Sequence, residues 1–77
     1  MNFFNKSTPV EVPARITKRV RALSRDDLIM WADQALTETG RALTAFNRDG
    51  NANSLVDAVT GSQVLTAIVS ELQGRAT

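Results

Sequence analysis

The chain has 77 residues, enough for one small domain and too few for a second. It is 43% hydrophobic and 22% charged, with a formal net charge of +1, which is typical of a folded globular protein. It contains neither cysteine nor histidine. That composition excludes a disulfide framework, a thiol nucleophile, the common zinc sites and imidazole acid–base catalysis.

Basic residues are concentrated in the first third of the chain. Residues 1–25 carry six lysines and arginines against one glutamate, whereas residues 26–77 carry three arginines against seven acidic residues. This asymmetry has two interpretations. The basic segment binds an anionic partner, or it folds back onto the acidic face of its own chain or of a neighbouring copy.

Residues 1–13 are expected to form an extended N-terminal arm. Pro9 and Pro13 bias the residues before them toward extended geometry, and Phe3 and Phe4 lie near the tip. The N-terminus lacks the apolar core of a signal peptide, and no apolar run approaches the ~18–20 residues that span a bilayer. We therefore expect a cytoplasmic protein.

Residues 14–23 are predicted to form a short basic helix. Ile16, Val20 and Leu23 recur at i, i+4 and i+7, which places them on one face, and basic residues occupy the remaining surface. Asp27 would interrupt that face. Ser24, three residues before Asp27, is instead typical of the N-cap of a new helix.

Residues 24–47 form the clearest predicted helix, with an apolar arc of about 160°. Gly40 lies in its middle, where glycine costs ~1 kcal/mol relative to alanine, so we expect a close approach of another helix there. The apolar arc contains Leu28, Trp31, Ala32, Ala35, Leu36, Ala42, Leu43 and Phe46, with Ile29 at its margin.

Residues 47–53 have the composition of a turn, and residues 54–73 are predicted to form a third helix. Its apolar face is about 180° wide. Gly61 and Ser62 predict a kink or a tight helix crossing, and Gly74 is predicted to end the helix, leaving a frayed tail. The face contains Leu55, Ala58, Val59, Leu65, Ile68, Val69 and Leu72.

The predicted fold is all-α: an antiparallel helical hairpin of residues 24–47 and 54–73, preceded by the basic helix 14–23 and the arm 1–13. Residues 14–77 would form a single domain. The two long helices share only one seam, and their apolar arcs are wider than such a seam covers. We therefore expect self-association, for example a homodimeric four-helix bundle, or a partner protein that completes the bundle.

We do not expect an enzyme, a cofactor, a metal site or a small-molecule substrate, because no catalytic or phosphate-binding motif is present. The expected function is a non-enzymatic protein–protein interaction module or small accessory subunit that docks through its apolar helix faces and its basic N-terminal arm. Trp31 is interpreted as a core residue or as an interface anchor. The predicted interface residues are Phe3, Phe4, Ile16, Val20, Leu28, Trp31, Leu36, Leu43, Phe46, Leu65, Ile68 and Leu72.

Two alternative functions use the basic segment. A small nucleic-acid-binding protein would contact phosphates through it, and a peripheral membrane adaptor would combine it with Phe3 and Phe4. The predicted arrangement of a helical hairpin with an N-terminal arm is similar to that of many small accessory subunits. This likeness concerns the arrangement of elements alone and does not imply a function. The basic residues concerned are Arg15, Lys18, Arg19, Arg21 and Arg25.

Overall fold

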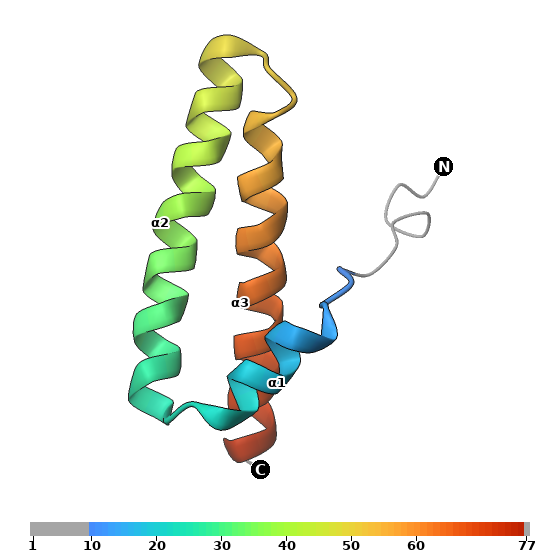
Figure 1. Cartoon of the computed structure of the whole chain (residues 1–77). Helices are drawn as coiled ribbons and strands as arrows, with labels where there is room; N and C mark the ends of the chain where they lie inside the picture. Colours follow the sequence, from blue (N-terminus) through green and yellow to red (C-terminus); the bar gives the residue numbers. More distant parts are fainter. Residues whose placement is uncertain (1–9, 77) are drawn as a thin grey trace, which may run out of the picture.

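The computed structural model describes residues 10–76, which contain three α-helices and no strand (Figure 1). The helices are α1 (Ala14–Ala22), α2 (Arg25–Asp49) and α3 (Ser54–Ala76). The all-α prediction is confirmed. Phe3 and Phe4, at the tip of the predicted arm, lie outside the described residues.

The junction between α1 and α2 follows from local capping. Pro13 precedes the first residue of α1, and Leu23 after its end adopts an extended conformation. The Ser24 hydroxyl accepts a hydrogen bond from the Asp27 backbone N–H at 3.2 Å, which satisfies a donor at the start of α2. The predicted restart at Ser24 is confirmed.

Both long helices extend further than their predicted ends. α2 runs through Asp49 and stops at Gly50, whose φ of 66° is left-handed and whose N–H donates to the Phe46 carbonyl at 2.7 Å. The connecting loop is therefore residues 50–53 rather than 47–53. The predicted end of α3 at Gly74 is wrong, because Arg75 pairs with Glu71 one turn earlier and the helix continues to Ala76.

α2 and α3 lie side by side and run in opposite directions, and α1 crosses the end of this pair that is remote from the loop (Figure 1). The buried core lies where all three helices meet. Toward the loop, the described chain consists of α2 and α3 alone (Figure 1). The core residues are Ile16, Val20, Leu28, Ala35, Val64, Ala67 and Ile68.

α2 and α3 pack tightly against each other at Gly61. A Cβ atom built there would collide with the Thr39 hydroxyl and lie 3.2 Å from the Ala35 carbonyl oxygen. Thr39 is fixed, since its Oγ1 donates to that same carbonyl at 2.7 Å. The tight crossing predicted at Gly61 is confirmed. The close approach predicted at Gly40 is wrong within this chain, because a Cβ there would meet nothing within 4 Å.

Replacing Gly61 by alanine is expected to destabilise the fold. Overpacking of a filled seam costs about 1–3 kcal/mol, against ~1 kcal/mol gained from helix propensity. A second substitution, Thr39→Ala, removes the nearest colliding atom and should recover part of the loss. Gly74→Ala is the control, because a Cβ at Gly74 would meet nothing within 4 Å. Urea unfolding followed by far-ultraviolet circular dichroism measures all three; equal stability of Gly61→Ala and Gly74→Ala would contradict the tight seam.

Candidate interaction surface

The structure divides the described members of the predicted interface into three groups. Ile16, Val20, Leu28 and Ile68 are buried in the chain's own core, so their side chains hold the three helices together. Trp31, Leu65 and Leu72 are half-buried at the margin of this core, and the other described members, which lie on α2, are exposed. The exposed members are Leu36, Leu43 and Phe46.

An apolar stripe runs along α2 on the side turned away from α1. Ile29, Leu36 and Leu43 are seven residues apart, a spacing that drifts only about 20° per repeat around a helix, and they are 47%, 59% and 51% exposed. Trp31 points toward α1, where it contacts Arg19. Leu36 follows Trp31 by five residues and therefore points about 140° away from it. The stripe and α1 thus lie on opposite sides of the layer formed by α2 and α3.

α3 extends this apolar surface with Leu65 and Val69. Ala67 belongs to the core that α1 covers, and Val69, two residues later, points about 160° away from it and is 54% exposed. Leu65 and Val69 also line a shallow hollow on the surface of α3. We call the surface formed by Ile29, Leu36, Leu43, Leu65 and Val69 the open face.

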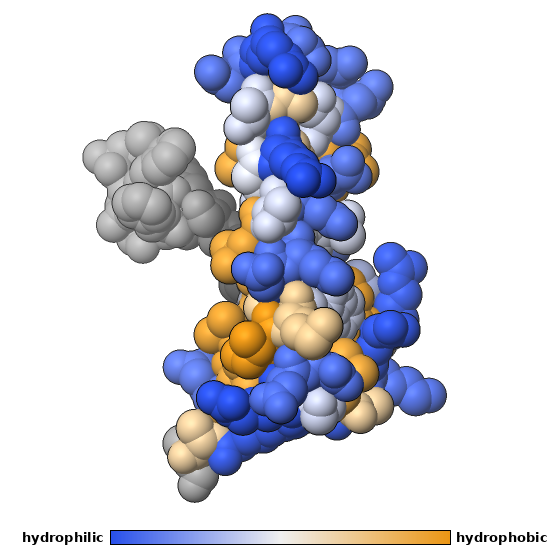
Figure 2. All heavy atoms as spheres, turned by 90° about the vertical axis from the view of Figure 1, so that its left-hand side faces the viewer, coloured by the Kyte–Doolittle hydropathy of each residue, from blue (hydrophilic) through white to orange (hydrophobic). Residues whose placement is uncertain are grey.

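The surroundings of the open face favour contact with another apolar surface. α3 carries no charged residue between positions 58 and 70. On α2, the hydrophilic side chains follow the outer side of the helix, and hydrophobic ones lie at its edges (Figure 2). Ile29 and Val69 were not among the predicted interface residues; the seven-residue spacing of Ile29 with Leu36 and Leu43 is the signal that could have identified the former.

The expectation that no segment reaches the length and hydropathy of a membrane span is wrong for α3. Ser54–Ala76 is long and apolar enough by length and composition, with a mean hydropathy of 1.2 over 18 residues. Core helices of soluble proteins meet the same criterion, but only 22% of this window is buried within the described chain. Much of the apolar content of α3 is therefore surface rather than core.

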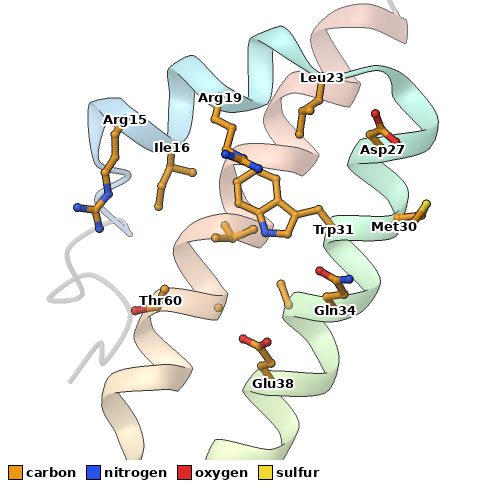
Figure 3. A pocket seen from close by; sticks show the side chains of 13 residues that line it. Arg15, Ile16, Arg19, Leu23, Asp27, Met30, Trp31, Gln34, Glu38 and Thr60 are labelled. Atoms are coloured by element: carbon orange, nitrogen blue, oxygen red, sulfur yellow. The ribbon is translucent and has the colours of Figure 1, made fainter.

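On the opposite side, α1 and α2 border a groove of about 850 Å³ (Figure 3). Arg15 and Arg19 line it from α1, and Asp27 and Glu38 line it from α2. The Arg19 guanidinium lies 5.5 Å from the centre of the Trp31 ring, a cation–π contact. Trp31 is thus partnered by its own chain, and both signs of charge border the groove.

The basic residues of α1 lie together on the side of the helix that faces away from its buried residues Ile16 and Val20. Arg15 and Arg19 border the groove, while Arg21 lines a separate small hollow together with Glu71. Lys18 is exposed, and the Arg25 guanidinium at the start of α2 lies 3.6 Å from the Asp26 carboxylate. Their positive charge therefore covers the exposed side of α1, and acidic side chains lie in the hollows at both of its edges.

Arg75 fixes the position of α1, a role that sequence reasoning missed by assigning it to a frayed tail. One guanidinium nitrogen donates to the carbonyl oxygens of Val20 at 3.4 Å and Leu23 at 2.8 Å. Its Nε donates to Glu71 at 2.8 Å, which holds the side chain in place. The available signal was the i, i+4 spacing of Glu71 and Arg75, which predicts a helical ion pair.

Neither the acidic side chains of the described residues nor the comparisons with known proteins indicate a particular chemistry. Within residues 10–76, no three Asp or Glu side chains form a group that could hold a metal ion. Comparison of the chain with protein-family models, curated proteins and solved structures finds no match. The chain's own surfaces therefore indicate what it can bind.

Removing the Arg75 guanidinium is expected to loosen α1 from α3. Arg75→Gln should lower the free energy of unfolding by about 1 kcal/mol, since the lost hydrogen bonds are charge-assisted but partly solvated. Trp31 fluorescence reports the change, because Arg19 on α1 covers the indole, and its emission should shift to the red. Arg48→Gln is the control, as Arg48 is exposed and pairs with its exposed neighbour Asp49 at 3.5 Å. Identical emission from the two variants would contradict this role of Arg75.

Proposed function

We propose that the protein is a non-enzymatic interaction module that docks onto another protein through its open face. The observation that carries this proposal is the continuity of that face. Its α2 members are spaced as in helices that pack against other helices, and each is about half exposed. Single exposed aliphatic residues are ordinary, whereas a contiguous apolar surface marks an interaction site.

The energetic reason is that small residues fill the middle of the α2–α3 seam, between the larger core side chains Leu28 and Ile68 and the loop. Ala35, Ala42 and Gly61 occupy it, which lets the two backbones approach closely. The larger side chains, such as Leu36 and Leu43, flank the seam and remain in contact with water. Covering them contributes ~25 cal/mol for each Å² of apolar surface removed from water. A partner helix laid along the open face would bury them.

A docking role also fits the absence of charge at this surface. Charged residues are depleted in the centres of protein interfaces, because each charge must lose its hydration. Residues 58–70 of α3 carry none, while the charged residues of α1 are all basic and α2 carries residues of both charges. The uncharged surface therefore resembles the centre of an interface.

Nucleic-acid binding through α1 is the second candidate, favoured by the exposure of Arg15, Lys18 and Arg21. Its weakness is that one neighbour, Arg19, is engaged by Trp31, and that acidic side chains of α2 and α3 line the hollows at both edges of this basic surface. The membrane alternative depends on Phe3 and Phe4, outside the described residues, and is favoured separately by the hydropathy of α3.

Position-specific photo-crosslinking in cells that produce the protein tests the docking proposal. A photoreactive side chain at Leu36 or Leu43 is expected to give covalent protein adducts. The same group at Thr37 or Thr44, which are exposed, should give few, because these positions turn away from the open face. Equal yields at all four positions would contradict docking through this surface.

Fluorescence anisotropy with labelled duplex DNA or RNA separates the nucleic-acid candidate. If α1 contacts phosphates, affinity should fall steeply between ~50 and ~200 mM salt. Lys18→Gln should then lower the magnitude of the slope of log affinity against log salt concentration by about one, the loss of one phosphate contact. Under the docking proposal, the purified chain shows no such salt-dependent binding.

A further inference from the structure

The apolar stripe on α2 has the same pattern of large and small residues in both directions along the helix. Leu36 lies at its centre, with Ile29 seven residues before it and Leu43 seven residues after it. Small residues lie four positions away on either side, Ala32 before and Gly40 after. The order is therefore large, small, large, small, large in either reading direction. A surface of this kind is complementary to a copy of itself turned by 180°.

Gly40 has no packing role within the single chain. It is exposed in the middle of α2, a Cβ there would meet nothing within 4 Å, and glycine at such a position costs ~1 kcal/mol of helix stability. A function in close contact with a second helix accounts for the missing side chain. With α2 paired against an antiparallel α2 and Leu36 at the centre, Gly40 lies opposite Ala32, so the two backbones can approach at two small residues.

The charges along α2 favour the same antiparallel arrangement. Residues 25–38 carry four acidic residues and one arginine, whereas residues 39–49 carry two arginines and one aspartate. A parallel pair would place two acidic halves side by side. An antiparallel pair places each acidic half beside a basic half and also opposes the helix dipoles.

We propose that the occupant of the open face is a second copy of this chain, with the two α2 helices antiparallel about a two-fold axis beside Leu36. This deepens the proposed function and rests on it. The symmetric pair brings Leu36 against the partner's Leu36 and Ile29 against the partner's Leu43. Leu65 and Val69 of α3 border the contact, so that four long helices enclose a second core.

Light scattering or sedimentation equilibrium on the full-length chain at tens of micromolar tests the association. The expected mass is twice the 8.4 kDa of one chain. Leu36→Glu should give a monomer with unchanged helix content, since Leu36 is exposed in the single chain and outside its core. Thr37→Glu, a matched charge on the outer side of α2, should leave the dimer intact. A monomeric native chain, or equal effects of the two variants, would overturn the proposal.

Single cysteines test the two-fold geometry, because the natural chain contains none. Under mild oxidation, Leu36→Cys should form a disulfide-linked dimer in high yield, and Thr37→Cys should not. An equimolar mixture of Ile29→Cys and Leu43→Cys should give the mixed dimer far more than either symmetric one. Preferential Ile29→Cys pairing with itself would indicate a parallel pair and overturn the antiparallel arrangement.

Different results would overturn the docking function and the pairing of two copies of the chain. If the purified chain is a monomer but Leu36 and Leu43 give photo-crosslinks to a different protein in cells, the second-copy proposal is overturned and the docking function stands. If those positions give adducts of two chain masses and the mixed disulfide forms, both stand. If neither the purified chain nor the cellular crosslinks show contact at this face, both are overturned.

Discussion

The structure is governed by the fact that two helices share only one seam. α2 and α3 are each more than twenty residues long, while α1 has nine residues and crosses the pair at one end. A short third helix can complete a core only where it lies. Val20, Leu28 and Ile68 become the most completely buried large side chains because they lie at that end. Away from that end, the aliphatic side chains of α2 and α3 contact each other at the seam and water on its flanks.

The composition of the seam follows from the same constraint. With no third helix to fill space near the loop, α2 and α3 gain contact by approaching closely, which requires small residues such as Ala42 and Gly61. Beyond the core at Leu28 and Ile68, small side chains therefore occupy the seam, and larger ones such as Leu36 and Leu43 occupy its flank. On the α1 side, the flank is partly covered, with Arg19 over Trp31. On the other side, Leu36, Leu43 and Val69 form the open face.

This distribution connects folding with function. A core of seven residues, most of them small or medium in size, provides limited stability for a chain of this length, and small domains commonly gain the remainder from oligomerisation or a partner. Association through the open face would therefore contribute to stability as well as to recognition. The groove beside α1 is a weaker candidate, because charges of both signs border it and its aromatic residue is already engaged within the chain.

The glycines show that the sequence alone does not decide the packing role of a single residue. Gly40 and Gly61 are both mid-helix glycines, and close packing was predicted at each. Only the placement of α2 against α3 distinguishes them, since Gly61 faces Thr39 and Gly40 faces solvent. Gly50 and Gly74 were both predicted in non-helical settings; Gly50 ends α2 with a positive φ, whereas Gly74 remains helical.

The sequence by itself determined the elements whose causes are local: three helices, the Ser24 cap, the turn near Gly50 and the excess of apolar surface over what one seam can hide. These depend on residues within one or two turns of each other. Only the tertiary structure decided which apolar residues form the core and which form the open face, because burial depends on where α1 docks. That position is set by contacts such as Arg75 with the Leu23 carbonyl, between groups 52 residues apart, which no local pattern specifies.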